Sequence, residues 1–192
     1  MASHPARRVG KGWSIGWMTL AYAAVGVALY AVANWTTFEI RIPGTEDVSV
    51  RPQFGLVTFF GFAFGPIVGF LVGFVGNVIG DQLSGTGAFS AWPWSLSNGA
   101  TGLLAGLASL MFADGRMAGR SRAFLAATAG VIATALGFGL IWIELVTQPE
   151  LGAEYILTRE YVPTVVANSI VAAIITPLLV LGWEPLREQM QP

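Results

Sequence analysis

The stretch FGPIVGFLVGFVGNVIGDQLSG, residues 64 to 85, is apolar and rich in glycine for most of its length and then supplies two polar residues, Asn77 and Asp81. The glycines that precede them at the same four-residue spacing are Gly65, Gly69 and Gly73. Residues four apart share one face of a helix, and small residues at this spacing let membrane helices approach closely. The stretch therefore predicts a closely packed membrane helix whose glycine face becomes polar toward one end.

The composition of the whole chain places it in the lipid bilayer. Of its 192 residues, 54% are hydrophobic and only 11% are charged, whereas soluble proteins carry about 25% charged residues. The net charge of −1 and a single lysine, Lys11, exclude the clustered basic surface that binds nucleic acid. The absence of cysteine excludes disulfides, thiolate metal sites and cysteine nucleophiles.

A membrane helix needs about 20 apolar residues to cross the hydrocarbon core, and the chain offers several such runs. The sequence predicts an all-α membrane protein, a compact bundle of six transmembrane helices in one membrane domain over residues 1–192. The spans are expected at 14–36, 53–64, 66–82, 92–112, 122–147 and 161–183. The second is short, and Gly65-Pro66 ends it, because proline removes an amide donor and disfavours helix in the residue before it.

Lysine and arginine collect on the cytoplasmic side of membrane proteins, and their distribution here predicts that both termini are cytoplasmic. In that orientation seven of the ten lie inside. They are Arg7, Arg8, Lys11, Arg116, Arg120, Arg122 and Arg187, against Arg41, Arg51 and Arg159 outside. The loop of residues 37–52 then lies outside, and a loop longer than about 12 residues in a compact chain is usually functional. The first apolar run exceeds the roughly 7 to 15 residues of a signal sequence, so we expect it to be retained.

The later spans carry ridges of the same kind as the opening stretch. Small residues follow one face of each helix toward the cytoplasm, and polar residues continue that face toward the outer end. The ridges are Trp94, Asn98, Gly102 and Gly106; Ala126, Gly130, Ala133, Gly137, Ile141 and Glu144; and Tyr161, Thr164, Asn168, Ala172 and Thr176. Helices that pack closely below and are polar above are expected to enclose a polar cavity that opens outward.

The polar and aromatic residues near the outer ends are the candidates for a substrate-binding site. They are Trp35, Arg51, Asn77, Asp81, Trp94, Asn98, Trp142, Glu144, Tyr161 and Asn168. Structural alternatives exist for them: tryptophans form interfacial belts, asparagines join helices by hydrogen bonds, and the two acids can lie at helix ends in the headgroup region. Ionisable residues within a membrane are costly and usually functional, so Asp81 and Glu144 suggest a cationic ligand.

Catalytic and metal-binding motifs are absent from the sequence. The only histidine, His4, precedes the first span, and no phosphate-binding G-x-x-x-x-G-K-[ST] loop occurs. Asp81 has no aspartate partner within another span, as an intramembrane aspartyl protease would need. We therefore expect no enzyme, no metal and no cofactor in this chain, but a binding subunit that draws its energy from elsewhere.

The runs VRPQFGLVTFFGFAFGPIVGFLVGFVGNVIGDQL (50–83) and WPWSLSNGATGLLAGL (92–107) resemble the substrate-binding S components of energy-coupling factor (ECF) transporters, most closely those of the UPF0397 type. The shared elements are the short second helix, the FGP break, the G-F-x-G-N segment with its Asp, and the Trp-rich start of the fourth helix. The resemblance implies a subunit in the cell membrane of a prokaryote that captures a vitamin or related micronutrient at the outer face. It would deliver this ligand by toppling against a transmembrane coupling subunit driven by two ATPase subunits, which use the ATP.

In this family an A-x-x-x-A motif on the first helix docks on the coupling subunit. Ala24 and Ala28 match that motif, and Ala21 and Ala31 extend the stripe. Ordinary packing within the chain is the alternative for these alanines. The resemblance leaves the micronutrient open between cobalamin, thiamine or its precursor, riboflavin and others. The alternative function is an autonomous small carrier or channel, and a membrane assembly protein without a ligand is a third.

Overall fold

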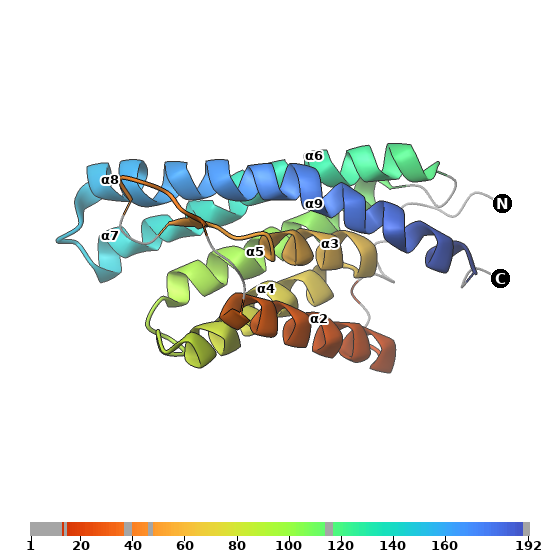
Figure 1. Cartoon of the computed structure of the whole chain (residues 1–192), viewed down its shortest axis with the longest axis horizontal. Coiled ribbons are helices and arrows are strands. Elements are labelled where there is room, and N and C mark those ends of the chain that lie inside the picture. The colour runs from red at the N-terminus through yellow and green to blue at the C-terminus, as the bar shows by residue number, and fades with distance from the viewer. Residues whose placement is uncertain (1–12, 14, 37–39, 46–47, 114–116, 190–192) are drawn as a thin grey trace.

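The computed structural model describes residues 13, 15–36, 40–45, 48–113 and 117–189, and most of them are helical. Within these ranges six helices of 11 residues or more form the body of the molecule (Figure 1). They are α2 (Trp17–Thr36), α3 (Phe54–Phe64), α4 (Pro66–Ser84), α5 (Trp92–Phe112), α6 (Gly119–Gly137) and α9 (Val162–Gln189). The predicted all-α architecture is confirmed.

Two of the helices continue through short segments of other helical geometry. These segments are the 3₁₀ helix η1 (Phe138–Ile143) and α7 (Glu144–Thr147) after α6, and α8 (Gly152–Tyr155) and the π-helix η2 (Ile156–Tyr161) before α9. The resulting rods cover residues 119–147 and 152–189. At 1.5 Å per residue the second rod is about 57 Å long. It is therefore longer than a hydrocarbon core of about 30 Å, and its ends reach both membrane surfaces.

The last rod begins at Gly152 and not near residue 161, where the sequence predicted its start. Glu154 and Arg159 interrupt the apolar pattern, but both side chains are exposed. A helix accepts charged residues on a face turned to water, so the break in hydropathy marks the membrane surface and not the helix end. The rod also continues to Gln189, beyond the predicted residue 183.

Four segments of the described chain are long and apolar enough to cross a membrane: 17–36, 66–84, 119–147 and 152–189. The other two helices differ for distinct reasons. α3 has only 11 residues, as the sequence predicted. α5 has 21 residues, but one face of it is polar, and that face is buried against other helices. The buried polar residues of α5 are Ser95, Ser97, Asn98 and Thr101.

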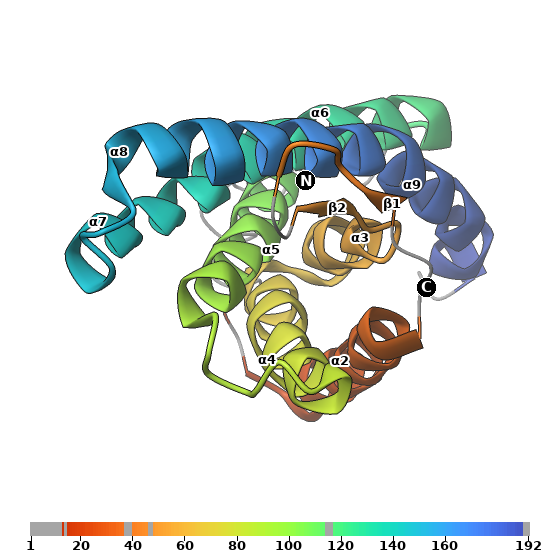
Figure 2. The same ribbon diagram turned by 60° about the vertical axis from the view of Figure 1, so that its left-hand side comes forward.

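The helices lie in three groups across the bundle. α6 and α9 run side by side along one edge, α2 and α4 lie at the opposite edge, and α5 and α3 lie between them (Figures 1 and 2). Eight of the 11 residues of α3 are buried, most of them aromatic or small. The strands β1 (Ile40–Arg41) and β2 (Ser49–Val50) pair antiparallel just before α3, and β2 contacts α9. The short central helix thus leaves room in the bundle at the end where the hairpin lies.

Glycine contacts bring α3, α4 and α5 together at backbone distance. A methyl group added at Gly61, Gly69 or Gly102 would overlap backbone atoms of a facing helix. The α4 and α5 glycines face each other directly, since a side chain on either would meet the carbonyl of the other. The close approach predicted from the small-residue ridges is confirmed at this level of the bundle.

The chain turns between α3 and α4 at a single residue. Gly65 has φ 107°, in the left-handed region that a residue with a side chain rarely adopts. Pro66 follows as the first residue of α4, a position where its missing N–H has no helical partner to lose. The two residues therefore end one helix and start the next without a loop.

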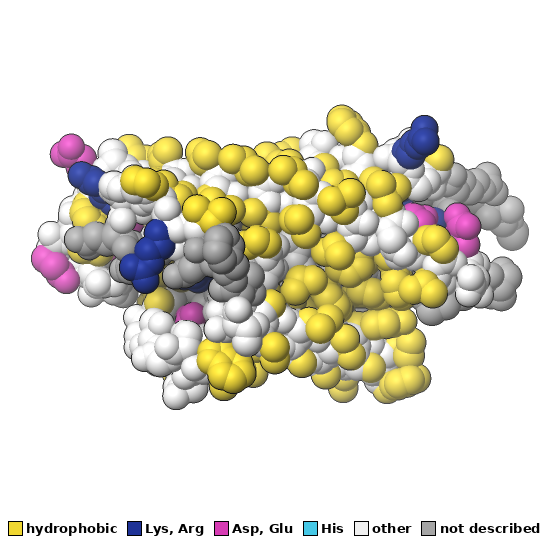
Figure 3. All heavy atoms as spheres, viewed as in Figure 1, with side chains coloured by type: hydrophobic (Ala, Val, Ile, Leu, Met, Phe, Trp, Pro, Cys, Tyr) yellow, Lys and Arg dark blue, Asp and Glu magenta, His cyan; other side chains and the backbone are white. Residues whose placement is uncertain are grey.

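Apolar side chains cover the outside of the bundle. Figure 3 shows them over the middle of the visible face, with most charged side chains near the two ends. Leu136 on α6 and Leu178 on α9 are 63% and 59% exposed. Such a surface is unfavourable in water and is the surface that a membrane helix presents to lipid.

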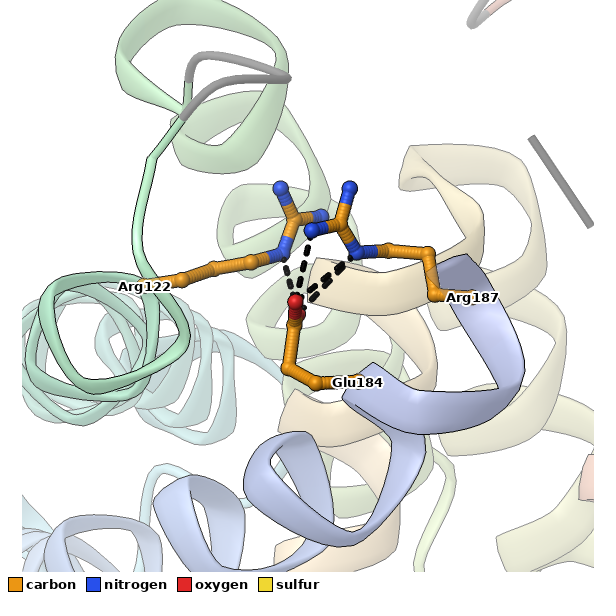
Figure 4. Close-up of polar contacts among 3 residues, drawn as sticks. All are labelled: Arg122, Glu184 and Arg187. Carbon is orange, nitrogen blue, oxygen red and sulfur yellow. Dashed lines mark hydrogen bonds and ion pairs between the residues drawn. The ribbon is translucent and has the colours of Figure 1, made fainter. Parts of the chain in front are cut away.

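A buried ion cluster joins α6 to α9 at the end of the bundle away from the hairpin. Glu184 lies between two arginines: its Oε1 is 3.1 Å from Nε of Arg122, and its Oε2 is 2.6 Å from a terminal nitrogen of Arg187 (Figure 4). The Arg122 guanidinium also lies 5.4 Å from the ring centroid of Phe62 on α3. The cluster thereby connects three helices at this end.

Candidate substrate-binding site

A cavity of about 590 Å³ opens at the end of the bundle that carries the β1–β2 hairpin. Its lining comes from α2, α4, α5, η1, α8, η2 and α9, from the hairpin, from the residues just before α3 with Phe54 at the start of that helix, and from the loop between α4 and α5. The polar lining residues are Asn34, Arg41, Ser49, Arg51, Gln53, Asn77, Asp81, Ser84, Thr86, Asn98, Arg159, Glu160, Thr164 and Asn168. The aromatic ones are Tyr30, Trp35, Phe54, Trp94, Phe138 and Tyr155.

Asn77 is the centre of a hydrogen-bond network on the α4 side of the cavity. Its Nδ2 donates to Oδ2 of Asp81 at 2.7 Å and to Oγ of Ser95 at 3.0 Å. Its Oδ1 accepts from the Tyr30 hydroxyl at 3.4 Å and from Nδ2 of Asn98 at 3.2 Å. An asparagine side chain has two donors and two acceptor sites, so these four bonds use them all.

The network continues from α4 to α2 and to the start of α3. Nδ2 of Asn34 donates to Oδ1 of Asp81 at 3.5 Å, and Nε2 of Gln53 donates to Oδ1 of Asn34 at 3.4 Å. Gln53 follows the hairpin directly, so this chain of amides links the α2–α4 side of the cavity to the hairpin segment.

The α9 side of the cavity is different, because two of its buried polar side chains, Thr164 and Asn168, show no side-chain hydrogen bond to the described residues. Thr164 is 4% exposed, and its Oγ1 has no hydrogen-bond partner in the described part of the chain. Asn168, one helical turn further on, is 7% exposed. Arg159, in η2, donates to the carbonyl of Gly44 in the hairpin loop.

An aromatic surface lies between these two sides. Phe54 and Phe138 have ring centroids 5.9 Å apart, and Trp94 packs edge-on against Phe138 at 6.3 Å. All three line the cavity. Flat apolar faces of this kind suit a planar ligand.

The charges in the lining do not select for a cation. The described lining has three basic residues and two acidic ones: Arg41, Arg51 and Arg159, and Asp81 and Glu160. The cationic ligand suggested by the sequence therefore has no support in the lining. In the same described ranges, no group of three or more His, Asp or Glu side chains is placed to hold a metal ion.

A family model described as ECF-type riboflavin transporter, S component, matches residues 14–184 of the chain. The chain belongs to this S-component family. The match extends over almost the whole described bundle and includes every residue that lines the cavity.

Individual relatives of this S component match over shorter lengths. UPF0397 proteins of Vibrio atlanticus, Streptococcus sanguinis and Aliivibrio fischeri are 34%, 40% and 35% identical to it over 93, 82 and 89 residues. These alignments cover 48%, 43% and 46% of this chain and 49%, 43% and 46% of the relatives. The chain thus spans about half the length of the curated relatives it matches. No solved structure matches it.

Seven of the ten binding residues expected in this S component line the cavity. They are Trp35, Arg51, Asn77, Asp81, Trp94, Asn98 and Asn168. The structure brings them together from five separate segments of the chain. Whether they touch a ligand stays a prediction, and for Asn77 the complete set of internal bonds favours the alternative role of joining helices.

The other three expected residues lie outside the lining. Glu144 is 2% exposed and lies behind Trp94, whose Nε1 donates to its Oε1 at 3.1 Å. Trp142 and Tyr161 pack on each other with centroids 6.3 Å apart, and the Tyr161 hydroxyl donates to the carbonyl of Ala135. The α6 ridge does face inward as predicted, but η2, α9 and the aromatic surface fill the space in front of it.

Among the cavity residues that were not predicted as binding residues are Tyr30, Asn34, Gln53 and Thr164. Thr164 was part of the ridge on the last span, and its position between Tyr161 and Asn168 is the signal that pointed to it. Tyr30 and Asn34 are four residues apart near the end of α2 and repeat the pattern of Asn77 and Asp81. Gln53 has no such signal, because its position depends on the fold of the hairpin.

The alanine stripe on α2 is only partly at the surface. Ala24 and Ala28 are exposed and Ala21 is half-buried, whereas Ala31 is 3% exposed and belongs to the core. The docking role stays a prediction, to which exposed Ala24 and Ala28 remain open, whereas Ala31 packs inside the chain.

Proposed function

We propose that this chain is the substrate-binding S component of an ECF-type importer, and that it captures a vitamin or related micronutrient in the 590 Å³ cavity. The observation that carries the proposal is the cavity itself, in a chain of this family. It gathers polar and aromatic side chains at one end of an apolar bundle. Its volume lies within the range of about 300 to 1,000 Å³ that is usual for small-molecule sites.

The cavity faces the outside of the cell in this proposal. The start of α2 and the end of α9 lie at the bundle end away from the hairpin (Figure 1). Arg120 and Arg122 at the start of α6 and Arg187 near the end of α9 lie there, and in the sequence the other four basic residues of the predicted cytoplasmic set precede α2 or stand between α5 and α6. This distribution supports a cytoplasmic location for that end. Both termini are then cytoplasmic, in the cell membrane of a prokaryote.

Delivery of the ligand requires partner subunits in this proposal. The contacts between α3, α4 and α5 at Gly61, Gly69 and Gly102 leave no space there for a side chain, and therefore none for a solute. A transmembrane coupling subunit and two ATPases supply the movement and the energy. The exposed Ala24 and Ala28 of α2 form the docking face for the coupling subunit.

Riboflavin is the first ligand to test, because the family description contains it and the aromatic surface of Phe54, Trp94 and Phe138 suits its planar ring. Thiamine, its pyrimidine precursor and cobalamin complete the panel. A ligand that binds only the folded state raises the apparent stability by RT ln(1 + [L]/Kd). Purified protein in detergent should therefore show a higher Tm with one vitamin of the panel than with the others.

Uptake separates this function from that of an autonomous carrier. Vesicles that contain this chain alone should bind the vitamin without accumulating it, and accumulation should require the coupling subunit, the ATPases and ATP. Net uptake by the chain alone would establish the carrier instead. If no vitamin in the panel changes Tm, the micronutrient-binding function is wrong.

A further inference from the structure

Two groups of uncharged and acidic side chains at the cavity differ in how their hydrogen bonds are used. We call the first the closed wall; it consists of Tyr30, Asn34, Asn77, Asp81, Ser95 and Asn98. We call the second the open wall; it consists of Gln53, Thr164 and Asn168. The first group lies on α2, α4 and α5, and the second lies on α9 and just before α3.

The closed wall directs most of its hydrogen bonds to itself. Asn77 uses all four of its positions on Tyr30, Asp81, Ser95 and Asn98. Both carboxylate oxygens of Asp81 accept bonds from within the wall. A ligand that bonded to Asn77 would have to break an existing bond, so its gain would be small.

The open wall presents polar atoms without partners in the described part of the chain, although Nε2 of Gln53 donates to Asn34 of the closed wall. Oγ1 of Thr164 and Oε1 of Gln53 are buried atoms that have no hydrogen-bond partner among the described residues. The two residues are only 4% and 6% exposed, and both line the cavity. In the same part of the chain no hydrogen bond is found for the amide of Asn168, which is 7% exposed and also lines the cavity. Buried polar groups are almost always bonded, and the lack of a partner among the described residues, at atoms that line a cavity, points to a ligand.

Resting on the function proposed above, we propose that Gln53, Thr164 and Asn168 recognise the ligand by hydrogen bonds, and that the closed wall only holds the helices. Thr164 and Asn168 are one helical turn apart, so their side chains are neighbours about 5 to 6 Å apart. A hydroxyl and an amide both donate and accept, and Oε1 of Gln53 accepts only. This set fits the amide-type edge of a planar heterocycle, where N–H donors alternate with C=O acceptors. The aromatic surface of Phe54, Trp94 and Phe138 would hold the flat face of the same ring.

Two threonines of α9 provide a matched test without any ligand. Oγ1 of Thr176 is 2.5 Å from Oγ1 of Thr58, and Thr176 is fully buried. Oγ1 of Thr164, by contrast, has no partner in the ranges that the structure describes. Thr176→Val should therefore lower Tm by about 2 °C, and Thr164→Val should leave Tm unchanged or raise it. Asn98→Leu should lower Tm more than Asn168→Leu, because of these two asparagines only Asn98 has a hydrogen bond within the described residues. Equal losses of Tm in Thr164→Val and Thr176→Val would overturn the assignment.

Ligand binding provides the second test, with riboflavin as the probe. Thr164→Val and Asn168→Leu should each weaken binding by about tenfold, and Thr176→Val should not change it. Riboflavin methylated at N3 lacks the N–H donor of its polar edge and should also bind the unmodified protein more weakly. Unchanged affinity in both open-wall variants would show that the ligand is held elsewhere. If no vitamin binds the unmodified protein, the proposed function fails, while the comparison of the threonine variants still decides between the two walls.

Discussion

The indole Nε1 of Trp94 donates a 3.1 Å hydrogen bond to Oε1 of Glu144, which is 50 residues away in the sequence and 2% exposed. The other carboxylate oxygen of Glu144 has no partner in the described part of the chain. Trp94 lines the cavity and Glu144 does not. The carboxylate therefore acts on the cavity through the tryptophan, whose ring it orients.

This relationship predicts that Trp94→Phe destabilises the protein more than the loss of one hydrogen bond would. The change leaves Glu144 without any bond to the described residues, and an unsatisfied buried polar group costs about 1 to 3 kcal/mol. Glu144→Gln keeps an acceptor for the indole and should remain within about 1 kcal/mol of the unmodified protein. Tm in detergent measures both effects. In a Glu144→Leu background Trp94→Phe should cost less, and an equal cost in both backgrounds would mean that the two residues are not coupled.

The glycine contacts predict that Gly102→Ala destabilises the bundle. Its new methyl group would meet backbone atoms of Gly69, and overpacking typically costs about 1 to 3 kcal/mol. Gly182→Ala is the matched control, since a methyl group there meets nothing within 4 Å. Removing a helical glycine at such a site should stabilise the protein by about 0.5 to 1 kcal/mol. Opposite shifts of Tm in the two variants are expected, and a neutral Gly102→Ala would contradict the close contact.

The ion cluster predicts a large effect of Glu184→Ala. The change leaves Arg122 and Arg187, whose side chains are only 11% and 13% exposed, without a compensating charge. Breaking a buried ion pair by removing one partner costs about 3 to 5 kcal/mol. Glu188→Ala, on the same helix but exposed, should change stability by no more than about 0.5 kcal/mol. Urea or thermal unfolding of the two variants measures the difference, and similar stabilities would show that Glu184 does not balance the arginines.

The exposed alanines of α2, Ala24 and Ala28, predict variants that bind the ligand but do not support its uptake. Ala24→Trp and Ala28→Trp place a bulky side chain on an exposed face, so they should preserve ligand binding and abolish uptake by the assembled importer. Leu29→Trp is the control on a different exposed face of α2, since Leu29 is 51% exposed, and should allow uptake. Ala31→Trp should instead destabilise the protein, because Ala31 is buried. Loss of ligand binding in Ala24→Trp would assign that face to internal packing.

The sequence predicted most helix bounds because the features that set them are local. Apolar runs, the Gly65-Pro66 break and the four-residue spacing of glycine are each visible within one helix. The start of the last rod was missed because Glu154 and Arg159 resemble a loop in a hydropathy pattern, although they lie on an exposed helical face. Helix bounds that are predicted from hydropathy are wrong where a helix continues through charged residues at the membrane surface.

The binding-site prediction was limited in a different way. The ridges show which side of a helix faces inward, and Asn77, Asp81, Asn98 and Asn168 all reach the cavity as expected. The ridges do not show which side chains of other helices lie in front of them. Glu144 also faces inward, but at its level Trp94 stands between it and the cavity.

By itself, the sequence of residues 64 to 85 determined a close-packed helix with one polar end, because spacing along a helix depends only on the helical repeat. The tertiary structure decided what that polar end does. Asn77 meets Tyr30, 47 residues away, and Asn98, 21 residues away, and such meetings depend on the rotation and height of separate helices. Because of that packing, Asn77 uses its hydrogen bonds on neighbouring helices, whereas Thr164 and Asn168 line the cavity.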